Sequence, residues 1–523
     1  MTIFARVDAF YERRRTVVIL GGIGAFYLIV NLVWLARDTL PPAWDQAAHA
    51  DHCLSYLRLF SAPASLSLTK LLPVSSYYPP FFYLVTVPAS ALFGFSYDVL
   101  AATHIVFLLV LAFAVLKIGE RLFGFCAGAG AAVLVALYPA VYGLSREVLL
   151  DFPVLAMVAL SQYVILAGKA GTSLKRGALL GLVLGLSVMT KWTAVAFLPG
   201  TFLVVFGEEF AKGNRTSRRK LLASLAIALC VFLAVVLPWL LANRPGFIKT
   251  ASAALYEDSL IQGDPTEVAA SVAYYGRALW KALVSPIIAT FTLLGVAAFG
   301  FGVRKGKAAA FLAAWALPAF LVFLLVPNKD GRNIVPLLPA LALFAASGLD
   351  TLRPMLLKRA AWGLIVLAGT VQFFAFSFGS PPGLKNGYAR PPRNEDWKAG
   401  EILRFLADRR PGRPLRVAFL PDLPYFNFST FRFTAHLANL PFVVDPVGTG
   451  PGTFEALGGY DALITKSGPL AVRFTLKERA AFRERFNASL KRRARTGLPF
   501  RPWKTFRLPD GSKARLFARI SGK

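Results

Sequence analysis

Residues 212–242, KGNRTSRRKLLASLAIALCVFLAVVLPWLLA, place a cluster of cations directly before twenty-two residues that carry no charge. As a helix those twenty-two residues would be about 33 Å long, which matches a bilayer hydrocarbon core of roughly 30 Å. The composition agrees, because the 523 residues are 56% hydrophobic and the mean hydropathy is +0.55. These values exceed those of soluble globular chains. The sequence therefore predicts an α-helical integral membrane protein.

Ten more stretches are apolar and long enough to cross a bilayer as helices. The eleven predicted spans are 17–36, 98–116, 124–143, 152–168, 177–190, 192–206, 221–242, 284–303, 308–326, 334–349 and 360–379. The first lacks a cleavage site of small residues, so we interpret it as a retained helix and not as a signal peptide. Residues 78–93 are shorter and begin Tyr-Tyr-Pro-Pro, which favours an interfacial helix in the first outer loop.

The basic loops test this count, because cytoplasmic loops of membrane proteins are enriched in Lys and Arg. With eleven spans, KGNRTSRRK and nearly all other basic loops face the cytoplasm. If residues 78–93 also crossed, KGNRTSRRK would face outward. We therefore expect a bacterial inner-membrane protein that spans the membrane eleven times and whose C-terminus is on the periplasmic side.

A soluble domain is predicted after the last span. Residues 1–379 form the membrane domain, the Pro- and Gly-rich residues 380–394 a linker, and residues 395–523 a small α/β domain. NEDWKAGEILRFLADRR begins with a cap signal and has helical periodicity, while LRVAFL, FVVD and YDALIT are typical of short strands. Residues 473–523 hold sixteen basic and three acidic residues. Anionic membrane lipids are favoured over nucleic acid as their partner, with a solvated helix face as the alternative.

Three ionisable side chains follow the first span in PPAWDQAAHADHCLSYL, residues 41–57. If 44–60 is a helix, Asp45, His49 and His52 share one face. This face could hold a divalent metal, or it could be structural with Asp45 as the helix N-cap. A third interpretation makes Asp45 a base that faces an outward cavity. The three cysteines add no zinc spacing and no disulfide framework.

Other outer loops supply cations and carboxylates. In SREVLLDFP, Glu147 and Asp151 have helical i, i+4 spacing and Arg146 lies outside the helix, where it could bind an anion; a capped helix start with a local salt bridge is the alternative. A second group of cations lies at other outer helix ends, and it consists of Lys191, Lys329 and Arg332. Lys191 could equally extend towards lipid headgroups. Together these residues suit a substrate with a phosphate on a lipid tail and a hydroxyl that must lose its proton.

Five motifs in order resemble those of the multi-spanning C-type glycosyltransferases, in the group of protein O-mannosyltransferases and bacterial lipid A aminoarabinose transferases. The resemblance covers about residues 10–350. It consists of Asp45 in the first outer loop, YYPPFFYL at 77–84, SREVLLD at 145–151, GLSVMTKWTA at 185–194 and GRNIVPLLP at 331–339. Two positions depart from the pattern. Gln46 stands where many protein mannosyltransferases have Glu, which weakens the hypothesis that the acceptor is a protein. Asn333 replaces the usual aromatic residue after the arginine.

The resemblance implies a GT-C fold and an inverting transfer of a sugar from a polyprenyl-phosphate donor. The acceptor would be a hydroxyl or phosphate on a glycolipid, lipid A, envelope glycan or protein. Asp45 would be the general base and Asp151 would assist it. The donor phosphate would bind Lys191 and Arg332, with Lys329 and Arg146 as further candidates; His49, Tyr78 and Glu147 would contact substrate. No cofactor is certain, and a divalent metal is possible.

A transporter or flippase of lipid-linked glycans is the alternative function. It would also need a cavity for an anionic headgroup, but charged residues would then be expected along a path through the membrane. None lies in the middle of a predicted span. A binding module with a membrane anchor is disfavoured because eleven spans exceed what an anchor needs.

Overall fold

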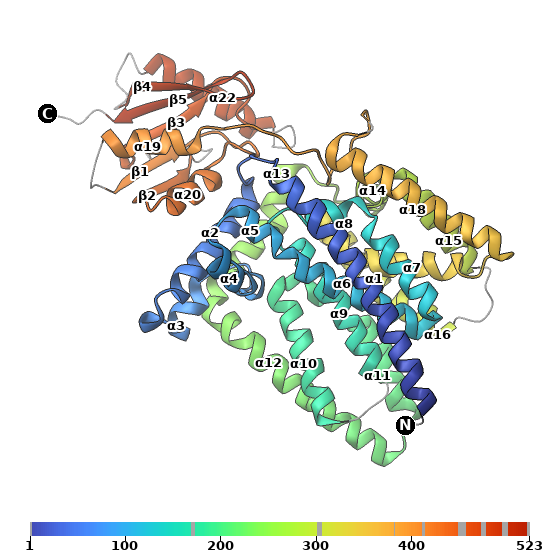
Figure 1. Cartoon of the computed structure of the whole chain (residues 1–523). Coiled ribbons are helices and arrows are strands. Elements are labelled where there is room, and N and C mark those ends of the chain that lie inside the picture. The colour runs from blue at the N-terminus through green and yellow to red at the C-terminus, as the bar shows by residue number, and fades with distance from the viewer. Residues whose placement is uncertain are drawn as a thin grey trace. The chain divides into compact units, whose positions relative to one another are not determined.

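The structure is a computed structural model that describes residues 3–168, 173–300, 306–380, 382–409, 414–447, 457–471, 477–493 and 500–519 (Figure 1). Its contacts divide the chain into two compact units. The membrane unit comprises Met1–Leu35, Pro63–Leu255 and Pro265–Pro392, and the C-terminal unit comprises Ala36–Ala62, Tyr256–Asp264 and Arg393–Lys523. The boundaries of these units differ from the predicted domain limits, because the C-terminal unit also includes residues 36–62 and 256–264. The domain limits stay a prediction.

The regular secondary structure of the membrane unit is helical in its described residues. Its α-helices are α1 Ile3–Leu35, α3 Leu68–Leu71, α4 Phe81–Phe93, α5 Tyr97–Ala102, α6 His104–Phe123, α7 Phe125–Ala136, α8 Pro139–Leu144, α9 Asp151–Gly168, α10 Leu174–Thr190, α11 Pro199–Lys212, α12 Arg215–Ser252, α14 Val268–Ala278, α15 Pro286–Gly300, α16 Gly306–Leu325, α17 Leu338–Leu349 and α18 Met355–Phe378. Short 3₁₀ and π segments join them: η1 Pro63–Ser65, η2 Leu72–Val74, η3 Trp192–Phe197, η5 Leu279–Leu283 and η6 Gly331–Leu337. The π segment η4 Ala253–Glu257 follows α12, and its last two residues belong to the C-terminal unit.

Within the described residues, seven helices are long and apolar enough to cross a bilayer, or eight if the bent pair Val268–Leu283 and Pro286–Gly300 is one span. Each of the eleven predicted stretches contains a helix, but α7, α10 and α11 have only 12, 17 and 14 residues. The chain has the helices of a multi-pass membrane protein, and the count of eleven crossings stays a prediction. Helix α4 has 13 residues, which at 1.5 Å per residue is about 20 Å and too short to span alone.

Glycines allow the closest helix contacts in the membrane unit. A Cβ on Gly348 of α17 would lie 1.8 Å from the carbonyl oxygen of Gly295 in α15, and a Cβ on Gly119 of α6 would lie 2.4 Å from Cα of Gly128 in α7. Small residues at such crossings let two backbones approach each other, which is a common way to pack helices in a membrane.

Substitution of Gly348 by alanine should force α15 and α17 apart. Overpacking of this kind costs about 1–3 kcal/mol, so we expect Gly348→Ala to lower the midpoint of thermal unfolding of the purified protein in detergent. Gly363→Ala is the control, because no atom lies within 4 Å of a Cβ placed there. Equal midpoints for the two variants would contradict this packing.

The C-terminal unit contains a five-stranded mixed sheet of order β2-β1-β3-β5-β4. Strand β1 pairs in parallel with β2 and β3, whereas β5 pairs antiparallel with β3 and β4. The elements are α2 Trp44–Phe60, α13 Asp258–Gln262, α19 Ala399–Arg409, β1 Leu415–Phe419, α20 Phe428–Leu437, β2 Phe442–Pro446, η7 Leu457–Gly459, β3 Ala462–Lys466, α22 Lys477–Arg493, β4 Phe500–Arg507 and β5 Lys513–Arg519. The predicted small α/β domain and its three strands are confirmed.

Alternation along the strands builds a hydrophobic core on each face of this sheet. Val417 and Phe419 of β1 pack with residues of α19 and α20 in one core, while Ala418 between them packs in the other core with Phe486 of α22. Figure 1 shows these helices around the sheet. Helix α19 begins at Ala399, five residues after Asn394, where the predicted cap signal starts. The Asp396 side chain accepts from Lys398 N (2.8 Å) and closes a turn before the helix.

Helix α2 belongs to the C-terminal unit although it follows the first span in sequence. The Thr430 hydroxyl donates to Pro42 O (2.8 Å), and Asp51 Oδ1 lies 2.6 Å from His436 Nδ1. Arg58 Nη2 donates to His436 O (2.7 Å), so both ends of α2 are fixed to α20. The predicted helix over residues 44–60 is present with the same bounds.

Candidate active site

Three predicted site residues meet in the membrane unit. Asp151 is the first residue of α9, Lys191 separates α10 from η3, and Arg332 is the second residue of η6. The Lys191 ammonium lies 2.7 Å from Asp151 Oδ1, and Arg332 Nη1 lies 3.8 Å from Asp151 Oδ2. One carboxylate therefore bridges two cations that lie 141 residues apart in the sequence.

Local structure presents each cation at a helix end. Lys191 follows the last residue of α10 in an extended conformation (φ −155°, ψ 125°) and ends that helix. Asp330 caps η6 by accepting from Arg332 N (2.8 Å), and its other oxygen lies 2.7 Å from Arg332 Nη2. Asp330 was not among the predicted site residues, although its place two residues before Arg332 in PNKDGRN was a signal for it.

The cluster combines two cations with two carboxylates, so it is formally neutral. Its burial is uneven, since the Asp151 side chain is 4% exposed, that of Lys191 14% and that of Arg332 29%. The carboxylates hold the cations apart and in fixed positions before any anion arrives. An oxyanion that reaches the partly exposed guanidinium would meet two cations whose charges are already compensated by Asp151 and Asp330. Such an arrangement suits charge-assisted binding of phosphate.

Aromatic rings border the cluster on the Lys191 side. Tyr78 lies with its ring centroid 4.6 Å from that of Tyr77, which in turn lies 6.2 Å from Trp192, the residue after Lys191. Phe247 of α12 contacts the same rings, 6.0 Å from Tyr77 and 5.9 Å from Trp192. The predicted substrate contact of Tyr78 stays a prediction, and the rings give it apolar neighbours.

Glu147 does not share a helix face with Asp151, and this expectation was wrong. Residues 145–150 are not helical, and α9 begins only at Asp151. Residue spacing alone predicted one helix through both positions, but α8 ends at Leu144. Glu147 is partly buried, and its proposed contact with substrate does not follow from helical spacing.

Arg146 lies in an aromatic box. Its guanidinium is 5.5 Å from the ring centroid of Trp34, 5.9 Å from that of Tyr142 and 5.2 Å from that of Phe373. Nε donates to Asn31 Oδ1 (2.8 Å), and the residue is 2% exposed. Burial lowers the pKa of Arg146 to about 10, so it remains a cation near neutral pH. These contacts support cation–π packing and give no support to the predicted phosphate contact.

Lys329 has a setting that its sequence position did not predict. Its ammonium donates to the carbonyls of Leu324 (2.9 Å), Phe323 (3.3 Å) and Val326 at the end of α16, and the residue is 2% exposed. A cation at this place satisfies terminal carbonyls and interacts favourably with the helix dipole. The structure therefore supports a helix-capping role for Lys329, and we leave it out of the proposed phosphate site.

Asp45 lies in the first turn of α2, in the C-terminal unit. The helix begins at Trp44 and its N-cap is Ala43, whose N–H donates to Gln46 Oε1 (3.3 Å). The interpretation of Asp45 as N-cap is therefore wrong. Its neighbour Trp44 donates from Nε1 to Asp422 Oδ1 (2.9 Å), and Asp422 Oδ2 lies 3.4 Å from Arg483 Nη2 of α22.

The metal hypothesis for the α2 face gains no support. His49 is 2% exposed and His52 is partly buried, so both lie mostly inside the protein. Across the part of the chain that the structure describes, no three His, Cys, Asp or Glu side chains are grouped closely enough to hold a metal ion.

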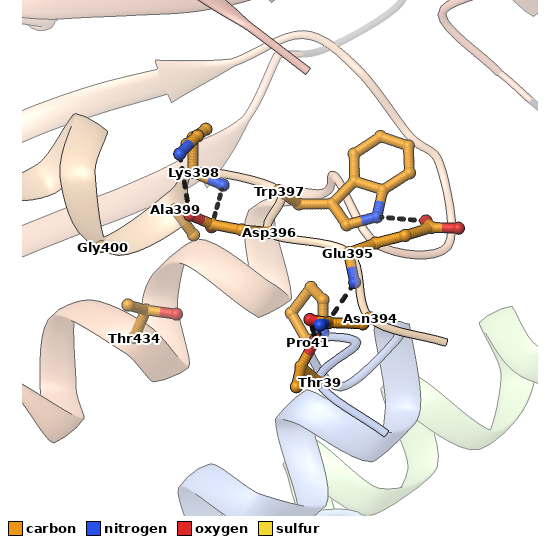
Figure 2. A pocket seen from close by; sticks show the side chains of 10 residues that line it. All are labelled: Thr39, Pro41, Asn394, Glu395, Asp396, Trp397, Lys398, Ala399, Gly400 and Thr434. Carbon is orange, nitrogen blue, oxygen red and sulfur yellow. Dashed lines mark hydrogen bonds and ion pairs between the residues drawn. The ribbon is translucent and has the colours of Figure 1, made fainter. Parts of the chain in front are cut away.

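A separate pocket of about 390 Å³ lies in the C-terminal unit (Figure 2). Its polar groups are paired with one another: Thr39 Oγ1 donates to Asn394 Oδ1 (2.9 Å), Trp397 Nε1 to Glu395 Oε2 (3.1 Å) and Lys398 Nζ to Asp396 Oδ2 (2.9 Å). Because each charge is matched locally, these groups account for the turn before α19 without a ligand.

Loss of one partner from the Asp151 cluster should be costly. Lys191→Met leaves a buried carboxylate without its nearest cation, and breaking a buried pair in this way costs about 3–5 kcal/mol. We expect a large fall in the thermal midpoint for Lys191→Met. In the double variant with Asp151→Asn, the fall should be smaller than the sum of the falls in the two single variants.

Lys212→Met is the matched control for that cycle, because Lys212 pairs with Glu208 at the surface and its side chain is 61% exposed. Exposed pairs contribute about 0–1 kcal/mol. Additive effects of Lys191→Met and Asp151→Asn would show that the two side chains do not interact.

Comparison with known proteins supports the fold. The model of the dolichyl-phosphate-mannose-protein mannosyltransferase family matches residues 78–241, a range that includes Asp151 and Lys191. No curated protein sequence matches the chain. The chain is similar to the crystal structure of ArnT from Cupriavidus metallidurans bound to undecaprenyl phosphate, with 14% identity, a TM-score of 0.58, and coverage of 97% of this chain and 99% of that one.

Two more solved structures share the architecture. Arabinofuranosyltransferase AftD from Mycobacteria has 14% identity and a TM-score of 0.59 over 97% of this chain and 40% of its own. The archaeal oligosaccharyltransferase AglB from Archaeoglobus fulgidus, in complex with an inhibitory peptide and a dolichol-phosphate, has 11% identity and a TM-score of 0.53 over 87% of this chain and 69% of its own. The predicted resemblance is confirmed, and the chain has the GT-C fold of the multi-spanning glycosyltransferases of the ArnT and mannosyltransferase type.

Proposed function

We propose that the chain is an inverting glycosyltransferase that moves a sugar from a polyprenyl-phosphate donor to a hydroxyl or phosphate acceptor at the outer face of the bacterial inner membrane. The observation that carries this proposal is the Asp151 cluster, which presents Lys191 and Arg332 within a GT-C fold. Similar structures hold undecaprenyl phosphate in ArnT and a dolichol-phosphate in AglB, and these are the donor carriers expected here.

The donor phosphate is assigned to Lys191 and Arg332. During transfer the bond between the sugar C1 and the phosphate oxygen breaks, and polyprenyl phosphate leaves with the electron pair. Negative charge on the leaving oxygen grows in the transition state, so fixed cations lower the barrier there. Asp151 assists by holding both cations, with Nζ of Lys191 2.7 Å from Oδ1.

The acceptor side is assigned to Asp45. Its carboxylate takes the proton of the acceptor hydroxyl as the oxygen attacks C1 from the face opposite the phosphate, which inverts the anomeric centre. Such general-base assistance contributes roughly 10²–10⁴-fold to the rate. A phosphate acceptor would need no base. Gln46 caps α2 through Ala43 N and supplies no second carboxylate, in line with an acceptor other than protein.

Substitution of Asp45 by asparagine tests the base directly. With a labelled polyprenyl-phosphate sugar and a hydroxyl acceptor, we expect Asp45→Asn to lower turnover about 10²–10⁴-fold and to leave the affinity for polyprenyl phosphate nearly unchanged. Asp408→Asn is the control, because it removes the charge of an exposed residue at the end of α19. Full turnover by Asp45→Asn would exclude the base role. Vesicle transport of donor without covalent transfer would favour the flippase alternative.

The side of the membrane is tested by labelling cysteines in spheroplasts. In a chain without Cys126 and Cys230, which are exposed, cysteine at Asp408 of the C-terminal unit should react with an impermeant maleimide. Cysteine at Ser217, in the first turn of α12 and within the basic cluster 212–220, should react only after lysis. The reverse pattern would place the basic loops outside and contradict the proposed orientation.

A further inference from the structure

Residues 386–390 of the predicted linker are held by hydrogen bonds within the membrane unit. Asn386 accepts from Tyr388 N (2.8 Å) and Ala389 N (3.2 Å) with Oδ1, while its Nδ2 donates to the carbonyls of Ala282 (3.0 Å) and Lys281 (3.3 Å). Those carbonyls belong to the π-helical segment η5. Trp34 Nε1 donates to Arg390 O (3.0 Å) at the other end of the segment. The backbone around Tyr388 is therefore held on both sides.

Two glycines make room for Tyr388. A Cβ on Gly143 would lie 2.2 Å from the Tyr388 carbonyl oxygen, and a Cβ on Gly331 would lie 2.6 Å from the Tyr388 hydroxyl oxygen. Gly331 is the first residue of η6 and directly precedes Arg332. The fixed segment thus places a phenol against the backbone that presents the guanidinium of the Asp151 cluster.

The surroundings keep this phenol protonated. Burial raises the pKa of Tyr388 well above its ordinary value, and the negative charges of Asp330 and Asp151 raise it further, against the lowering effect of Arg332. Its hydroxyl makes no hydrogen bond with any residue that the structure describes, whereas the hydroxyl of neighbouring Tyr274 donates to Lys329 O (3.0 Å). Tyr388 is therefore a neutral hydrogen-bond donor beside the Asp151 cluster, and its hydroxyl proton has no acceptor among the described residues.

We infer that Tyr388 is a further binding residue for the donor, whose hydroxyl donates a hydrogen bond to the phosphate held by Lys191 and Arg332. This inference rests on the proposed function. Donor recognition would then combine two point charges with one directional neutral donor, and the linker segment would form part of the active site.

Tyr388→Phe tests the inference because it removes one oxygen and keeps the ring. The probe is undecaprenyl phosphate, titrated into the full-length protein in detergent. A hydrogen bond to a charged group corresponds to roughly a 10-fold to 100-fold change in Kd, so we expect Tyr388→Phe to bind that much more weakly. In the transfer assay the KM for the donor should rise, while the KM for the acceptor stays unchanged.

Tyr163→Phe is the matched control. Tyr163 lies on α9, twelve residues or about 18 Å along the helix from Asp151, with its ring against Arg121 and Phe113. It also loses a hydroxyl that makes no hydrogen bond with the described residues. We expect wild-type affinity from this variant.

Gly331→Ala provides a second, independent variant. The new methyl would overlap the Tyr388 hydroxyl at 2.6 Å but would lie 3.7 Å from Cζ of the ring, an ordinary contact distance. We expect Gly331→Ala to weaken binding in the wild-type background by displacing the hydroxyl. The same change in the Tyr388→Phe background should add little, because the displaced oxygen is already absent.

The outcomes separate this inference from the proposed function. If the wild type binds undecaprenyl phosphate and Tyr388→Phe binds it equally well, the role of Tyr388 is overturned and the proposed function stands. Equal losses from Gly331→Ala in both backgrounds would also overturn it, because the glycine would then act independently of the hydroxyl. If the wild type binds no undecaprenyl phosphate, the proposed function fails and this inference fails with it.

Discussion

The candidate donor site depends on the carboxylate of Asp151, which interacts with both of its cations. It is almost fully buried, it holds the Lys191 ammonium at 2.7 Å, and it faces Arg332 at 3.8 Å. Cations placed next to each other repel, and at a membrane boundary they would otherwise turn towards water or lipid headgroups. The carboxylate removes that tendency for both side chains. The ends of α9, α10 and η6 are therefore connected through one ionised group.

A different constraint governs the candidate base. Asp45 follows the first span by nine residues, yet α2 is folded onto α20 through Thr430, His436 and Arg58. The indole of Trp44 is fixed by Asp422, which also pairs with Arg483. The orientation of the first turn of α2 thus depends on the C-terminal unit, while the cations assigned to the donor depend on helices of the membrane unit.

Sequence reasoning succeeded where local signals were strong. Apolar length marked the helices, Lys191 stood between the apolar stretches 177–190 and 192–206, and short runs typical of strands marked β1, β2 and β3. It failed where tertiary contacts decide. Nothing in PNKDGRN distinguishes Lys329, which caps α16, from Arg332, which faces Asp151.

The same limit applies to the other misjudged positions. Spacing suggested a helix through Glu147 and Asp151, but α8 ends at Leu144 and a turn follows. The aromatic box of Arg146 gathers rings from α1, α8 and α18, which no sequence window contains. Tyr388 lay in a segment whose composition indicated only a linker.

The assignment of α2 to the C-terminal unit has a consequence for exchange between related proteins. A soluble domain encoded by one continuous segment could be exchanged between related proteins, or deleted, in a single recombination event. Here the unit is assembled from three separate stretches, 36–62, 256–264 and 393–523. A chimera that replaces only the C-terminal stretch would pair a foreign α20 with the native α2, so productive recombination must exchange these pieces together, and the three stretches are expected to vary jointly among homologues.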